Sequence, residues 1–118
     1  MKKIDYIIKY PERKYKKFWN PLFRDKKNWL FGYFKPTARS LEELTYLELH
    51  KYPELFLLVK GRIVLTLKKN KNSRIEELEL KPGEVVIVNC WHNGYALEPD
   101  SVSLVIERPV NPTKKIML

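Results

Sequence analysis

The 118-residue sequence has one cysteine, two histidines, four glycines and no glutamine. A single thiol, Cys90, can form neither an internal disulfide nor a zinc ribbon, which excludes a disulfide-stabilised secreted scaffold. The few glycines form no phosphate-binding loop, and no Gly-x-Ser-x-Gly nucleophile motif is present. The two histidines, His50 and His92, limit histidine-based catalysis to one pair. The lack of glutamine beside abundant lysine and glutamate hints at a thermophilic source.

Long apolar runs are also missing. The longest, residues 55–59, ends at Lys60, far short of the roughly 18 residues that cross a bilayer. The first residues carry scattered charge and no apolar stretch of signal-peptide length. We therefore expect no membrane partner and, by default, a cytoplasmic location. With 44% hydrophobic and 31% charged residues, the composition indicates one folded domain over residues 1–118.

The net charge of +9 is concentrated at the start of the chain. Residues 1–39 hold 12 lysines and arginines against 3 acidic residues, whereas the remaining 79 residues hold 11 of each kind. Aromatic residues interleave this charge, a composition used to bind single-stranded nucleic acid or another polyanion. Apolar anchors such as Ile4, Tyr6, Trp19 and Phe23 favour instead a segment that covers a sheet. We expect a basic, aromatic N-terminal extension over residues 1–39, with edge strands, that supports a homodimer. The alternative is a non-enzymatic, metal-free module that binds nucleic acid or another polyanion through this segment.

Short segments with strand character recur along the rest of the chain. The aromatic segment 29–34 is followed by apolar segments separated by turn residues, and strands are predicted at 44–50, 54–60, 62–67, 74–80, 85–91 and, after "HNGY", 101–109. This spacing predicts an antiparallel sandwich or small barrel. A helix of at most about two turns is predicted only between Pro11 and Pro21, where it would carry Tyr15, Phe18 and Trp19.

Residues 40–50 are compatible with two structures. A capping-box pattern at residues 40–43 favours a helix start. The leucines that follow break the helical stripe and Pro53 closes the segment early, which favours a strand over 44–50. In a strand the side chains of Tyr46, Glu48 and His50 point to one face, because side chains alternate with a period of two.

A metal site is predicted where these strands end. Glu48 and His50 would project side by side, and Glu54 begins the next strand after a short turn. His92, which follows another strand, is available as a fourth ligand. Carboxylate and imidazole donors suit a divalent transition metal such as Fe, Mn, Ni or Zn better than a soft metal that prefers thiolates.

The order His50, three residues, Glu54, six residues, Gly61 resembles the first motif of the cupins, which are small β-barrels of the jelly-roll type. The stretch "LKPGEVVIVNCWHNGY" is similar to their second motif, with Gly83 as its opening glycine and His92 as its histidine. The resemblance covers roughly residues 44–108. It implies an all-β fold with a single antiparallel jelly-roll barrel, whose core we place at residues 40–110.

The resemblance also implies the site. One metal would be held by Glu48, His50, Glu54 and His92, with Glu48 in the place of the family's first histidine. The second motif departs from the family pattern, since "NCW" replaces its Pro-x-Gly turn and brings His92 two residues nearer the opening glycine.

The expected function is binding or transformation of a small polar molecule, such as a sugar or an organic acid, by Lewis-acid chemistry of the metal. Either glutamate at 48 or 54 could act as a base if it is not a ligand. The predicted contacts to the small molecule are aromatic residues that would wall a pocket in a barrel and one cation at a strand end: Tyr46, Trp91, Tyr33 and Arg108.

Overall fold

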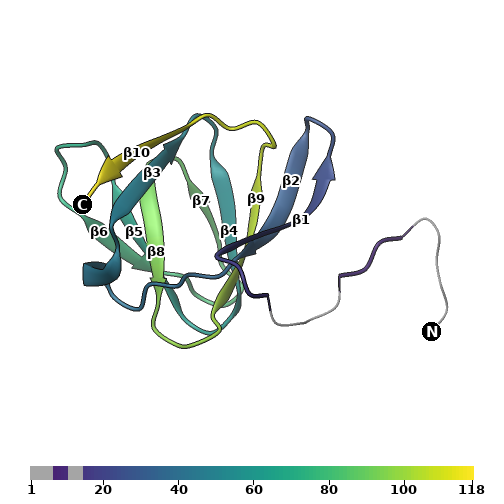
Figure 1. Ribbon diagram of the computed structural model, residues 1–118, viewed down its shortest axis with the longest axis horizontal. Coiled ribbons are helices and arrows are strands. Elements are labelled where there is room, and N and C mark those ends of the chain that lie inside the picture. The colour runs from purple at the N-terminus through teal and green to yellow at the C-terminus, as the bar shows by residue number, and fades with distance from the viewer. Residues whose placement is uncertain (1–6, 11–14) are drawn as a thin grey trace.

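The computed structural model describes residues 7–10 and 15–118. Two five-stranded antiparallel sheets make up almost all of the regular structure and face each other (Figure 1). The first sheet has the strand order β1 (Trp19–Asp25), β2 (Trp29–Phe34), β9 (Val102–Glu107), β4 (Glu54–Lys60) and β7 (Val85–Val88). The second has the order β10 (Thr113–Met117), β3 (Tyr46–His50), β8 (Trp91–Ala96), β5 (Ile63–Lys68) and β6 (Glu76–Glu79).

The hydrophobic core lies between the two sheets. Apolar side chains from alternate positions of strands in both sheets meet there, and seven are buried: Phe34, Phe56, Ile63, Leu65, Leu80, Val88 and Val105. Inward-facing residues at every second position are the pattern of a sandwich whose two inner faces share one core. The arrangement is all-β, as predicted, and fits a jelly roll.

The predicted helix between Pro11 and Pro21 is wrong for its described part. Pro11 lies outside the described residues, residues 15–18 are not helical, and Trp19 begins β1. Pro21 is tolerated inside β1 because this strand lies at the sheet edge and its register is irregular between Pro21 and Phe23. The anchors predicted at Ile4 and Tyr6 also lie outside the described residues.

Strands β1 and β2 belong to the first sheet. β2 pairs with β9 from Leu30↔Glu107 to Phe34↔Ser103 and places Phe34 in the core. An extension outside the barrel over residues 1–39 is therefore not confirmed, because this segment supplies two strands that complete a sheet, β1 at its edge.

Two further local predictions are resolved by backbone pairing. The strand predicted at 44–50 is confirmed as β3, and the alternative helix is reduced to a single 3-10 turn at Leu41–Glu43 with no side-chain cap from Ser40. The "HNGY" stretch, expected between strands, lies inside β8. The Asn93 side chain makes this conformation stable by donating to the Tyr46 carbonyl at 3.0 Å and accepting the Gly94 N–H at 2.8 Å. Strand β10 was not predicted.

Among the described residues, no helix is long and apolar enough to span a membrane.

Candidate metal centre

Three chemistry-bearing side chains converge from both sheets. His50 is the last residue of β3, and His92 is the second residue of the neighbouring β8, both in the second sheet. Glu54 is the first residue of β4 in the first sheet, after the short connection 51–53. The connection thus carries the chain from one sheet to the other and turns Glu54 back toward His50.

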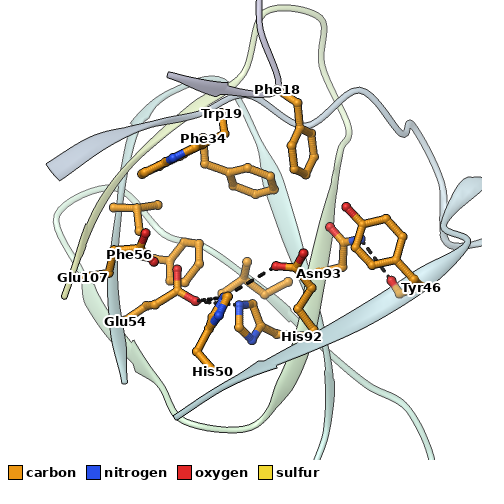
Figure 2. Close-up of a pocket in the computed structure, with 13 residues that line it drawn as sticks. Phe18, Trp19, Phe34, Tyr46, His50, Glu54, Phe56, His92, Asn93 and Glu107 are labelled. Atoms are coloured by element: carbon orange, nitrogen blue, oxygen red, sulfur yellow. Dashed lines mark hydrogen bonds and ion pairs between the residues drawn. The ribbon is translucent and has the colours of Figure 1, made fainter. Parts of the chain in front are cut away.

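The Glu54 carboxylate faces both imidazoles (Figure 2). Its Oε1 atom is 2.6 Å from His50 Nε2 and 2.9 Å from His92 Nε2. The candidate ligand atoms of the three residues all lie within 4.8 Å of one another. Two imidazole nitrogens and one carboxylate oxygen at such spacing form a group that could hold a metal ion.

Hydrogen bonds on the far side of each ring fix the tautomers. His92 Nδ1 lies 2.8 Å from the Cys90 carbonyl, which can only accept, so Nδ1 carries the proton. His50 Nδ1 lies 2.7 Å from Thr113 Oγ1, and this hydroxyl already donates to the Asn111 carbonyl at 3.0 Å. His50 Nδ1 must therefore donate as well. In both neutral rings the Nε2 lone pair then faces Glu54, as metal-binding histidines require.

Glu54 Oε1 is a buried oxygen whose two short contacts lack hydrogen-bond geometry. With both histidines neutral in the Nδ1–H form, three lone-pair-bearing atoms face one another, which is unfavourable unless a proton or a metal ion is shared among them. Divalent transition metals are the cations that prefer this donor set. The residues present therefore fit a bound metal.

The metal-free cluster is electrostatically coupled. Burial raises the pKa of Glu54, but the two imidazoles outweigh burial and lower it to about 2. Burial lowers the pKa of His50, whereas Glu54, followed by Glu48 and Glu107, raises it above its ordinary value. Glu107 has its pKa raised to about 7, first by burial and then by the nearby Glu54 carboxylate. In the absence of a metal, His50 and Glu107 therefore each hold a proton to a higher pH than usual.

Glu48, the predicted ligand from the family's first-histidine position, stands apart from this group. Its Oε2 lies 3.5 Å from His50 Nε2, and its side chain is 29% exposed, against 7% for Glu54. Its Oε1 atom lies 3.9 Å from the Lys115 ammonium on β10. Glu48 pairs directly across from His92 in the sheet, so it borders the cluster, and the three-residue group does not include it.

The cluster opens into a cavity of about 350 Å³. One end carries the histidines and glutamates, and the other is walled by aromatic rings (Figure 2). The lining residues are Phe18, Trp19, Phe34, Tyr46, Glu48, His50, Glu54, Phe56, Leu65, His92, Asn93, Val105 and Glu107. Concave, mostly apolar pockets with a few convergent polar groups are typical small-molecule sites.

Of the four predicted small-molecule contacts, the structure brings only Tyr46 to the cavity. Trp91 is buried under the Lys71 side chain, Tyr33 packs edge-on against Tyr15, and Arg108 lies over the Tyr52 ring at 4.2 Å. All three have other contacts and do not line the cavity. Trp91 and Tyr33 adjoin cavity residues in the sequence, but neighbours along a strand point to opposite faces.

Glu107 is the site residue that the sequence prediction missed. Ser103, Val105 and Glu107 occupy alternate positions of β9, and the first two are almost completely buried, so Glu107 faces the interior as well. The alternation in "SVSLVIE" carried this signal. The prediction chose Arg108, and a shift of one residue along a strand selects the opposite face.

Comparison with known proteins identifies the fold. No protein-family model matches the sequence, and no curated protein matches it either. A cupin-2 domain containing protein from Shewanella frigidimarina is 18% identical, with 80% of this chain and 84% of that chain covered and a TM-score of 0.58. Protein NMB1881 from Neisseria meningitidis is 14% identical, with coverages of 80% and 88% and a TM-score of 0.53.

A third solved structure is larger. HppE, solved as its cobalt(II) form in complex with substrate, is 19% identical and superposes with a TM-score of 0.63 over 86% of this chain. The chain spans 57% of HppE. At these identities the likeness concerns the fold, and the chain has the fold of the cupin superfamily.

Proposed function

We propose that this cupin-fold chain holds one divalent transition metal at His50, Glu54 and His92 and uses it to bind a small molecule in the adjoining cavity. The observation that carries the proposal is the buried Glu54 Oε1, which lies 2.6 and 2.9 Å from two Nε2 atoms whose rings donate from Nδ1. The relatedness in fold to HppE, which was solved with cobalt(II), supports it.

The donor set narrows the choice of metal. Two histidines and one carboxylate on one side of an ion, with the remaining positions open, are typical of non-haem Fe(II) sites. Mn, Ni and Zn accept the same donors, so Fe(II) is the first candidate among the four. When bound, such a metal supplies Lewis-acid polarisation of a hydroxyl or carbonyl oxygen of the ligand.

The chain's own residues would prepare the ligand. The rings of Phe18, Trp19 and Phe34 line the wall facing the cluster and keep water from the apolar part of the ligand (Figure 2). Glu48 and Glu107 line the cavity outside the three-residue group, so their carboxylates can bind a ligand donor or accept a proton from it. We also propose that residues 1–118 form a single domain, since β1 and β2 complete the sheet that carries Glu54.

Metal analysis of the purified protein tests the function. The parent protein should carry a stoichiometric transition metal, and His50→Ala and Glu54→Gln should lose it. Glu84→Gln, an exposed change on the turn before β7, is the matched control and should keep it. Metal content that is the same in the parent, His50→Ala and Glu54→Gln would remove the site.

The predicted homodimer and nucleic-acid binding stay predictions. The aromatic side chains of the described N-terminal region pack largely on one another: Phe23, Trp29 and Phe31 form a cluster, and Tyr10 meets Phe31 edge-on. A salt series of oligonucleotide binding tests the second, because binding to phosphates weakens steeply with ionic strength.

A further inference from the structure

The cavity has an unbalanced set of charged residues. Three of the 13 residues that line it are glutamates, and none is a lysine or an arginine. If the metal takes Glu54, as proposed above, the carboxylates of Glu48 and Glu107 remain to face the ligand. One divalent ion cannot neutralise three carboxylates. An anionic ligand would therefore meet carboxylates inside the cavity, and the one lysine beside them, Lys115, lies at the rim against Glu48 and does not line the cavity.

Of the two remaining carboxylates, that of Glu107 is better placed to bind a ligand inside the cavity. It follows the buried Val105 on the inward face of β9 and lines the cavity next to Glu54. The neighbouring Arg108 lies over the Tyr52 ring and does not line the cavity. Among the described residues, the lysine and arginine ion pairs use other acids, namely Asp100, Glu79 and Glu48. Glu107 therefore has no lysine or arginine partner in this part of the chain, and its carboxyl group lies close to Glu54 and His50.

The wall opposite the acids is aromatic. Phe18 and Phe34 meet edge-on with ring centroids 5.1 Å apart. Phe56, which meets Phe34 at 6.1 Å, lies instead at the acid end beside Glu54 and Glu107 (Figure 2). Trp19 completes this wall above the cluster (Figure 2). Aromatic faces attract cations and also pack against flat apolar groups. The cavity thus offers carboxylates at one end and ring faces at the other.

The cavity rim already holds one cation by the same two contacts. The Lys115 ammonium lies 4.6 Å from the centroid of the Tyr46 ring and 3.9 Å from Glu48 Oε1. Tyr46 and Glu48 both line the cavity, and they occupy alternate positions of β3. A carboxylate and an aromatic face therefore cooperate to bind an ammonium group at the edge of this site.

We propose that the cavity selects a cationic amine with a flat apolar body, its ammonium group on Glu107 and its body against Phe34 and Trp19. This inference rests on the proposed function, because assigning Glu54 to the metal is what leaves Glu107 for the ligand. It replaces the organic acid expected from the sequence with a ligand of opposite charge. An arylalkylamine has the required chemistry and fits within about 350 Å³.

Three probes of similar size and different charge test the selection. Zinc-loaded protein is titrated calorimetrically at neutral pH with 2-phenylethylamine, 2-phenylethanol and 3-phenylpropionate. We expect the amine to bind roughly tenfold or more tightly than the carboxylate, with the alcohol between them, because one charge-assisted hydrogen bond is worth about a factor of ten. Equal affinities, tighter binding of the carboxylate, or no binding of any probe would overturn the proposal.

A matched pair of variants tests whether Glu107 supplies the carboxylate that binds the ammonium group. Glu107→Gln should weaken amine binding about tenfold and leave binding of the alcohol nearly unchanged. Arg108→Gln changes the next residue, which lies outside the cavity, and should leave binding of all three probes unchanged. An amine affinity that is the same in Glu107→Gln and the parent would contradict the assignment, since it would mean that the amine binds elsewhere, for example on the zinc.

The metal analysis and the titrations can refute the proposed function and the charge selection independently of each other. Protein that carries no metal and still prefers the amine would refute the proposed function and keep the preference for a cation, but the reason for assigning the amine to Glu107 would fall with the metal. Protein that loses its metal in His50→Ala but prefers 3-phenylpropionate would retain the function and refute the charge selection. The comparison of the three probes needs only the parent protein, so it stands even if Glu107→Gln does not fold.

Discussion

Thr113 on β10 is the cross-strand partner of His50 on β3, and its hydroxyl oxygen lies 2.7 Å from His50 Nδ1. The same hydroxyl donates to the Asn111 carbonyl, so it can only accept from the imidazole. Thr113 therefore fixes the tautomer that presents Nε2 to the cluster. The last strand of the chain thus takes part in the site, although it carries no candidate ligand.

Thr113→Val should weaken metal binding without unfolding the protein. Valine keeps the shape of the side chain and removes the acceptor, and loss of such a supporting hydrogen bond typically costs 10–100-fold in metal affinity. We expect at least a tenfold loss in a zinc competition assay. Thr113→Ser retains the hydroxyl and should bind zinc like the parent. Equal affinity in Thr113→Val and the parent would show that the hydroxyl does not orient His50.

Metal affinity should fall as the pH is lowered from 8 to 6. The pKa of His50 is raised above its ordinary value in the metal-free protein, mainly by Glu54 against the opposing effect of burial. A metal must therefore displace a proton, and this competition grows stronger below the raised pKa. Zinc affinity measured at pH 6 and pH 8 checks the direction. An affinity that does not change with pH would mean that no histidine proton is released.

Glu107→Gln should stabilise the metal-free protein at alkaline pH. Because the pKa of Glu107 is raised from 4.5 to about 7, the folded state keeps a proton that the unfolded state has lost between these values. The stabilisation that this proton gives to the folded state is thus complete below pH 4.5 and is lost as the pH rises through 7. Glutamine stays uncharged, so at pH 8 the variant should be more stable by about 1–2 kcal/mol, which allows for the partial exposure of Glu107.

Urea unfolding of metal-free protein at pH 8 and pH 4 measures this difference, which should disappear at the lower pH. The exposed Glu84→Gln serves as control and should match the parent at both values. Parallel pH profiles for Glu107→Gln and the parent would contradict the buried environment assigned to Glu107.

Gly61→Ala should destabilise the fold far more than Gly83→Ala. Both glycines have positive φ angles, 78° and 81°, which cost an alanine about 1 kcal/mol. A Cβ at Gly61 would also collide with Ser101 Oγ, whereas one at Gly83 meets nothing within 4 Å. Ser101 is buried and accepts the Arg62 N–H, so it cannot move freely. Chemical denaturation should give a loss of about 3 kcal/mol for Gly61→Ala and about 1 kcal/mol for Gly83→Ala.

The sequence was most informative where the spacing of nearby residues alone determines where their side chains lie. The three residues between His50 and Glu54 form a tight connection, so both side chains had to end near each other. Alternation along β3 placed Tyr46 and Glu48 on the cavity side with His50. Each segment predicted as a strand from residue 44 onward overlaps a strand of the structure, although the segment 85–91 runs from β7 to the first residue of β8.

The sequence was least informative where pairing between strands that are distant in the sequence determines the local structure. Near Pro21, local preference predicted a helix, but pairing of β1 with β2 gives a strand that tolerates the proline at its edge. The Asn93–Gly94 pair suggested a turn, yet hydrogen bonds of the Asn93 side chain hold it within β8. Glu107 and Thr113 come from strands remote in the sequence, and only the order of strands in the sheets brings them beside His50 and Glu54.

The two imidazoles belong to one sheet and the carboxylate to the other. An ion bound by all three would therefore act as a clasp between the layers, and its departure would let them separate at this end of the sandwich. Ion binding would then be coupled to the separation of the two sheets. Amide hydrogen exchange in β3, β4 and β8 should therefore be slower in the ion-bound protein than in the ion-free protein.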